Sequence, residues 1–137
     1  MAHEQEIVKV DSKGRITIPA HIRAELGMKE GSYVSVRLDR EDKSVVVRLF
    51  AGSQAKLVEM RLMIPDRPGA LARAARALGD LNVDLLSSNS RTIKKGEIAE
   101  WVVVADVGQL NTGIEEVKKR LIMSRDAISV EVRELRL

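Results

Sequence analysis

KVDSKGRITIP, the stretch from Lys9 to Pro19, decides how the first part of this chain folds. Apolar and polar residues alternate on both sides of Ser12-Lys13-Gly14, which predicts two short β-strands joined by a tight turn. Gly14 can adopt a positive φ at this turn without steric cost, and Pro19 ends the second strand because it has no N–H for a strand ladder. Two strands alone are marginally stable in water. We therefore expect this hairpin to pair with strands of a second copy of the chain.

The composition is that of a globular protein with a small core. The chain has 137 residues, of which 45% are hydrophobic and 31% charged, and this length fits one domain or two very small ones. Aromatic residues make up only 2% of the chain, so aliphatic side chains must build the core, and a small core favours oligomerisation. The net charge of +3 is too small to indicate nucleic-acid binding unless the cations cluster locally.

Several classes of function are disfavoured by the residues that the chain lacks. It has no cysteine, which excludes disulfides and thiolate chemistry and suits a cytoplasmic location. No apolar run is long enough to span a membrane, and the N-terminal residues do not form a secretion signal. His3 and His21 are too isolated to hold a metal. Since no catalytic triad or glycine-rich phosphate loop is present, we expect no enzyme, no catalytic residue and no cofactor.

The pattern divides the chain into two blocks, residues 5–50 and 57–137, joined by a small polar linker at 51–56. In the first block, the hairpin is followed by a short helix over residues 21–26. Gly27 provides a natural C-terminal stop for this helix. Two further strands are predicted over residues 33–38 and 44–49.

The second block is predicted to contain two helices and four strands. Its strands cover residues 57–64, 83–92, 98–107 and 128–135. One helix covers residues 70–81, and the other begins near residue 112. We expect the first helix to turn Leu71, Ala74, Ala75 and Leu78 inward. The resulting β-α-β-β-α-β order is that of a ferredoxin-like fold, so the chain belongs to the α+β class.

The first block resembles the AbrB/SpoVT/MazE swapped-hairpin DNA-binding family. The resemblance rests on Val10-Asp11, Gly14 to Pro19, Ile22-Arg23, Leu26-Gly27, and Gly31 with the strand from Val34 to Leu38. It implies a homodimer, or a higher oligomer, whose hairpins interleave into one small β-barrel. It also implies that Arg15 and Arg23 contact double-stranded DNA, with Lys9 and Lys13 as supporting cations.

The second block resembles an ACT domain, the small regulatory module common in amino-acid metabolism. The resemblance rests on two segments, Asp66 to Leu71 and Leu81 to Asp84. It implies side-by-side pairing of two domains and an amino-acid effector bound where they meet.

The cations of the hairpin have the chemistry that duplex DNA requires. An arginine can donate two parallel hydrogen bonds to a phosphate or to a guanine, whereas Lys9 and Lys13 would serve as point charges that position the backbone. Charges on turns are usually just solvated, and the family resemblance is what favours DNA contact by Arg15. Arg23 could instead pair with Asp11 or Glu25.

The loop from Pro68 to Leu71 is suited to a carboxylate ligand. A helix begins there with free N–H groups, and Gly69 lets a ligand approach the backbone closely. Asp66 could hold the ammonium group of an amino acid, and Asn82 could bond across a dimer interface. Alternatively, Asp66 caps the helix and Asn82 satisfies a turn. The candidate ligand-binding residues are Asp66, Pro68, Gly69, Ala70, Leu71 and Asn82.

These observations favour a DNA-binding transcriptional regulator whose ACT-like domain senses an amino acid or fixes the oligomer. Two alternatives stay open. One is an antitoxin-like or enzyme-regulatory interaction module that does not bind DNA. AbrB-type proteins often hold arginines at the positions of Val8 and Ala24, which are apolar here, and this difference favours the interaction module. The other is an architectural DNA-binding protein whose ACT-like half binds no ligand.

Overall fold

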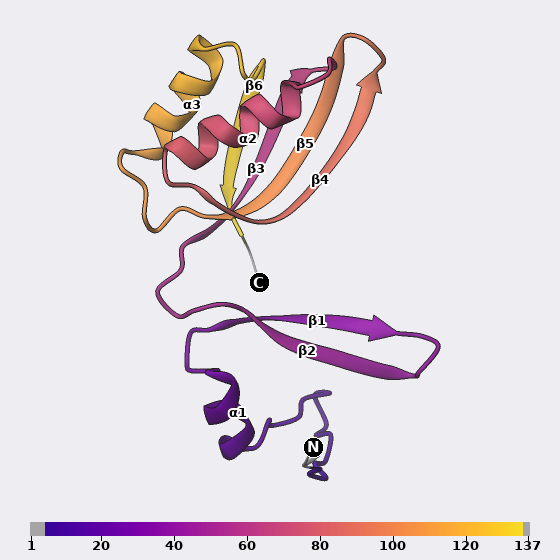
Figure 1. Ribbon diagram of the computed structural model, residues 1–137. Helices are drawn as coiled ribbons and strands as arrows, with labels where there is room; N and C mark the ends of the chain where they lie inside the picture. The colour runs from indigo at the N-terminus through magenta and orange to yellow at the C-terminus, as the bar shows by residue number, and fades with distance from the viewer. Residues whose placement is uncertain (1–4, 136–137) are drawn as a thin grey trace. The chain divides into compact units, whose positions relative to one another are not determined.

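The computed structural model describes residues 5–135 and divides the chain into two compact units (Figure 1). The first unit ends at Gln54 and the second begins at Ala55, so the division falls inside the segment expected to be a linker. Within the part of the chain described, no helix is long and apolar enough to cross a membrane.

The first unit consists of a short helix and a two-stranded sheet. Helix α1 (Ala20–Leu26) ends at Gly27, which has a φ of 72° and is therefore in the left-handed region that glycine tolerates. Strand β1 (Tyr33–Asp39) pairs antiparallel with β2 (Ser44–Ala51) through a charged turn. The helix buries none of its residues, and most side chains of β1 are exposed. Over residues 5–54, a single copy of this unit thus has no hydrophobic core of its own.

The predicted strands around residues 8–11 and 15–18 are wrong for the single chain. The expected turn is present, since Gly14 has a φ of 78° and its N–H donates to the carbonyl of Asp11 at 3.1 Å. The segments on either side of the turn, however, are not strands. Their apolar side chains stay exposed, to 61% for Val10 and 55% for Ile16. The alternation of residues encodes two strands, but one chain offers them no neighbour with which to pair.

The second unit has the predicted β-α-β-β-α-β order. Its elements are β3 (Leu57–Pro65), α2 (Ala70–Asp80), β4 (Asp84–Lys94), β5 (Ile98–Asp106), α3 (Ile114–Met123) and β6 (Ser129–Glu134). The four strands form one sheet in the order β4-β5-β3-β6, and every neighbouring pair is antiparallel. Both helices lie on the same face of this sheet (Figure 1).

The core of the second unit lies between the sheet and its two helices. Met60, Leu62 and Ile64 of β3 are almost fully buried there. The side of α2 facing the sheet is formed by Ala70, Ala74 and Leu78, which recur every four residues along the helix. The prediction that Leu71 points inward is wrong, because its side chain is 38% exposed. The opposite face of the sheet is covered by neither helix.

Candidate functional sites

Asp11 organises the turn of the N-terminal segment. Its Oδ1 accepts hydrogen bonds from the backbone N–H groups of Lys13 (2.8 Å) and Arg15 (2.9 Å). Its Oδ2 accepts a third bond from Nε of the Arg15 guanidinium at 2.8 Å. The backbone bond from Arg15 is the main reason that the pKa of Asp11 is lowered, followed by the side-chain bond from Arg15 and the backbone bond from Lys13. One carboxylate therefore holds both the turn and the arginine that follows it.

The sequence-predicted DNA contacts Lys9, Lys13 and Arg15 lie on or beside this turn, and all three are exposed. The Arg15 side chain is 70% exposed although it is paired with Asp11. Because Asp11 engages Nε, the two terminal nitrogens of the guanidinium can face an incoming ligand. Residues 9–23 carry a formal charge of +3, equal to that of the whole chain. All of the net positive charge is thus concentrated in this segment.

Arg23 differs from the other three cations. It lies in α1, and its guanidinium donates from Nη1 to the backbone carbonyl of Ile18 instead of pairing with Asp11 or Glu25. This bond connects the helix to the segment that precedes it, and the residue is half-buried. Arg23 therefore has a local structural role as well as a positive charge next to the turn.

Asp66, in the loop between β3 and α2, is held by the turn between β4 and β5. Its Oδ2 accepts a hydrogen bond from the N–H of Gly96 at 2.7 Å, and its own N–H donates to the carbonyl of Glu97 at 3.1 Å. The N-cap residue of α2 is Gly69 and not Asp66. The carboxylate thus fixes the loop in place and keeps its second oxygen available to a ligand.

Gly69 occupies the N-cap position of α2 with a φ of 83°. A Cβ at this position would come within 2.9 Å of Nη1 of Arg73. Pro68 and Leu71 are exposed beside it, whereas Ala70 is buried. Arg73 is not among the residues predicted from the sequence, although its position one turn after Gly69 is a usable signal. Arg73 places a positive charge where the first N–H groups of α2 already favour an anion.

Asn82 lies beyond the other end of α2. It has a φ of 68°, and its Nδ2 donates to the backbone carbonyl of Gln109 at 3.1 Å. Because an eleven-residue helix is about 16 Å long, Gly69 and Asn82 of one chain cannot contact the same small ligand. A ligand that contacts both residues would require two chains.

A shallow cavity adjoins the β3–α2 loop. It has a volume of about 530 Å³ and is lined on one side by Pro65, Arg67, Gly96 and Glu97. Its other side is formed by residues from the end of α3 and the segment after it: Ile122, Arg125, Ala127 and Ile128. Two guanidinium groups, one carboxylate and an apolar wall suit a small zwitterion. Arg67 is exposed and lies in the wall of this cavity.

Among residues 5–135, no group of three or more metal-ligating side chains is found.

Each unit matches a known family. Residues 7–49 match the family described as antidote-toxin recognition MazE, bacterial antitoxin, and residues 58–121 match the ACT domain family. The two resemblances in the sequence are confirmed, in that order along the chain. No curated protein matches the chain. A MazE/AbrB-like domain suggests an antitoxin or a DNA-binding regulator, and an ACT domain suggests ligand binding.

Proposed function

We propose that the chain is a DNA-binding transcriptional regulator, not an enzyme, and that it acts as a homodimer or higher oligomer. The N-terminal segments of two copies interleave into a small barrel, which supplies the missing strand partners of residues 8–11 and 15–18. The single observation that carries this proposal is the turn at Asp11. There an exposed arginine is held in a fixed position within a segment that carries the whole net charge of the chain.

In this proposal, Arg15 contacts a phosphate or a guanine through its two terminal nitrogens. Lys9 and Lys13 contact phosphates and set the position of the protein on the duplex without reading sequence. Arg23 supports the turn through Ile18 and contributes long-range attraction. Two copies bring eight such cations together, enough to neutralise about four to six phosphates.

The test is duplex DNA binding by the full chain, measured by fluorescence anisotropy at several salt concentrations. Arg15→Ala removes two phosphate or base contacts per dimer, so we expect affinity to fall by about tenfold or more and the log–log salt slope to become less steep by about 2. Lys119→Ala, which removes one exposed cation of α3, is the matched control and should change neither quantity. Duplex binding that survives Arg15→Ala undiminished contradicts the assignment.

We further propose that the ACT domain binds an amino acid at the loop from Asp66 to Leu71. Arg73 and the first N–H groups of α2 would take the carboxylate, and Asp66 would take the ammonium group. Asn82 would reach the ligand from a second chain. A ligand can shift DNA affinity only if it binds the two arrangements of the oligomer differently. The test is DNA affinity with and without a panel of amino acids; unchanged affinity throughout rejects the sensor and favours an ACT domain that only oligomerises.

The second candidate function is an antitoxin-like or enzyme-regulatory interaction module. The observation that favours it is the matched family itself, which is described by toxin recognition. The apolar side chains of Val8 and Ala24 and the engagement of Arg23 by Ile18 also reduce the cationic surface available to DNA. In this case, the purified chain binds duplex DNA weakly or not at all, and Arg15→Ala has no effect on that residual binding.

A further inference from the structure

The face of the sheet that no helix covers has an ordered chemical pattern. Met60, Leu62 and Ile64 of β3 point into the core, so Glu59, Arg61 and Met63 point to the other face. Residues directly opposite one another on neighbouring strands share a face, and the strand register therefore places on this uncovered side three rows that cross all four strands. We call these rows the open face: Ser87, Val104, Glu59 and Arg133; Asn89, Val102, Arg61 and Glu131; Arg91, Glu100, Met63 and Ser129.

The first two rows of the open face complement each other on every strand. On β4 both rows have a small polar residue, and on β5 both have a valine. On β3 the first row has an acid where the second has a base, and on β6 the order of charge is reversed. Within either row, the charged neighbours on β3 and β6 are of opposite sign.

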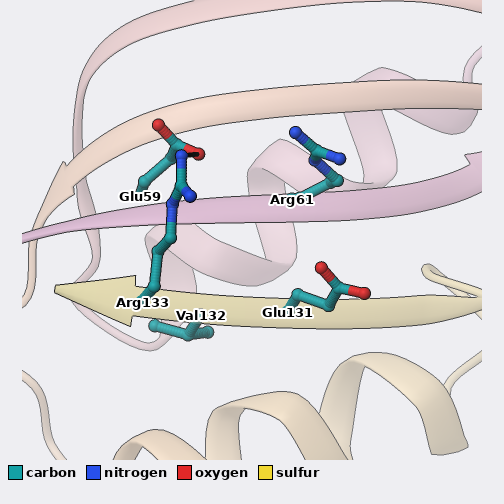
Figure 2. A pocket seen from close by; sticks show the side chains of 5 residues that line it. All are labelled: Glu59, Arg61, Glu131, Val132 and Arg133. Carbon is teal, nitrogen blue, oxygen red and sulfur yellow. Dashed lines mark ion pairs between the residues drawn. The ribbon is translucent and has the colours of Figure 1, made fainter. Parts of the chain in front are cut away.

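Charges on the open face balance. Arg133 Nη2 lies 2.7 Å from Glu59 Oε1, and Figure 2 shows these two side chains meeting above β3 and β6, with Arg61 and Glu131 further along the same strands. Glu100 is buried, and its two oxygens lie 3.0 Å from Nε of Arg91 and 3.7 Å from Nε of Arg61. Three arginines thus balance three glutamates, so the face does not attract a polyanion such as nucleic acid.

We propose that the open face pairs with the open face of a second copy, about a two-fold axis that runs across the strands between the first and second rows. This axis places each first-row residue opposite the second-row residue on the same strand of the other copy. Glu59 then faces the partner's Arg61, and Arg133 faces the partner's Glu131. Val104 faces the partner's Val102, and Ser87 faces the partner's Asn89. Every facing pair of these two rows is complementary, and strands stay aligned as in ordinary sheet packing.

A hollow on the face fits this arrangement. It has a volume of about 200 Å³ and is lined by Glu59, Arg61, Glu131, Val132 and Arg133. A long side chain of a facing copy would fill it and meet a charge of opposite sign. An axis along either diagonal of the four corners would bring like charges together. An axis along the strands between β3 and β6 would also pair opposite charges, but it would leave β4 and β5 without a facing strand.

The size of the face sets the strength of the contact. Four strands and three rows cover about 19 Å by 20 Å, or about 400 Å² in projection, against about 800 Å² per partner in a stable complex. The contact is therefore weak by itself and becomes effective when a second contact raises the local concentration of the copies. Pairing of the N-terminal units would provide such a contact, but the inference does not depend on DNA binding.

Charge reversal on β6, the edge strand, tests the pairing in the full chain. Arg133→Glu places a carboxylate opposite the partner's Glu131, and Glu131→Arg places a guanidinium opposite the partner's Arg133, so each variant alone repels itself. In a mixture of the two variants, the new glutamate of one chain faces the new arginine of the other, so opposite charges meet again between chains. The contacts within each chain are not restored by mixing, so recovery reports the contact between chains. After co-expression, we expect native mass spectrometry to show heteromeric assemblies in about tenfold excess over homomeric ones.

The matched control is Lys119→Glu mixed with Glu115→Arg, both on the exposed side of α3, which should give the statistical distribution. A statistical distribution for the β6 variants as well would overturn the proposal. A second measurement does not depend on charge. Since the chain contains no native cysteine, Ser87→Cys mixed with Asn89→Cys should be joined between chains by a short bis-maleimide cross-linker, which spans the gap between packed sheets, more readily than either variant alone. Equal cross-linking in all three samples would also overturn it. Duplex binding of the same variants is scored separately, so the two proposals can fail independently.

Discussion

The substitution Asp11→Asn should keep the turn but release the side chain of Arg15 that Asp11 holds. Both backbone amides, those of Lys13 and Arg15, bond to Oδ1, and an asparagine oxygen can keep both bonds. Only Oδ2 holds Nε of Arg15, and the asparagine would present an N–H donor there in place of an acceptor. The turn should therefore survive while the guanidinium is released.

Two opposite effects on DNA binding follow from this release. The substitution removes one negative charge per chain, so the net charge of a dimer near the phosphates becomes more positive by two. Affinity for mixed-sequence duplexes should therefore rise about two- to fivefold, since these charges lie within about a Debye length of the phosphates. The released arginine no longer has a fixed direction. We expect the ratio of affinities between the preferred and the mixed sequence to fall by about tenfold, because an oriented arginine–guanine contact supplies discrimination of this order.

Fluorescence anisotropy with a selected duplex and a mixed-sequence duplex measures both quantities. Glu41→Gln, which removes one negative charge from the turn between β1 and β2, is the control and should leave the ratio unchanged. Asp11→Ala removes all three bonds and should weaken binding to both duplexes. If Asp11→Asn weakens mixed-sequence binding while the ratio stays the same, the carboxylate does not act through Arg15, and the reasoning is refuted.

Three further outcomes are expected. The lowered pKa of Asp11 means that its ionised form stabilises the turn at and above the ordinary carboxyl range near pH 4. That contribution should be lost as the pH falls through the lowered value, so the amide of Arg15 should lose protection from exchange only in acid; loss near pH 6 would contradict this. Gly69→Ala should destabilise the second unit by about 1–2 kcal/mol in urea unfolding, because an alanine is strained at the positive φ of this position and its Cβ would crowd the Arg73 guanidinium. Leu78→Ala, at a fully buried position, should cost about 2–5 kcal/mol in the same assay, and a loss below about 1 kcal/mol would show that this core is not close-packed.

Local patterns were sufficient to predict most of the secondary structure. The alternation from Tyr33 to Leu38 encodes a strand, and Gly27 ends α1 because its left-handed backbone suits a residue without a Cβ. In the second unit, each strand and helix lies within a few residues of its predicted bounds, since hydrophobic periodicity directly reports which side of an element is buried.

Features that depend on a distant neighbour could not be predicted. The arms around residues 8–11 and 15–18 have the pattern of strands, but pattern alone does not say whether a partner is present. Leu71 carries a larger apolar group than Ala70, yet Ala70 faces the sheet because it shares the helix face of Ala74 and Leu78. At the candidate sites, the bond between Asp66 and Gly96 joins residues that are thirty positions apart, so local spacing gave no signal for it. The hydrogen bonds from Asp11 to the turn could have been predicted, because an aspartate at the start of a turn often accepts bonds from the backbone N–H groups that follow it.

The most direct test of the central claim is the salt dependence of duplex DNA binding by the unmodified chain. If two N-terminal segments join their cations into one surface, log affinity should fall linearly with log salt concentration, with a slope of about −4 to −5 between about 50 and 200 mM. A slope shallower than about −2, or no binding at the lowest salt concentration, would contradict the account.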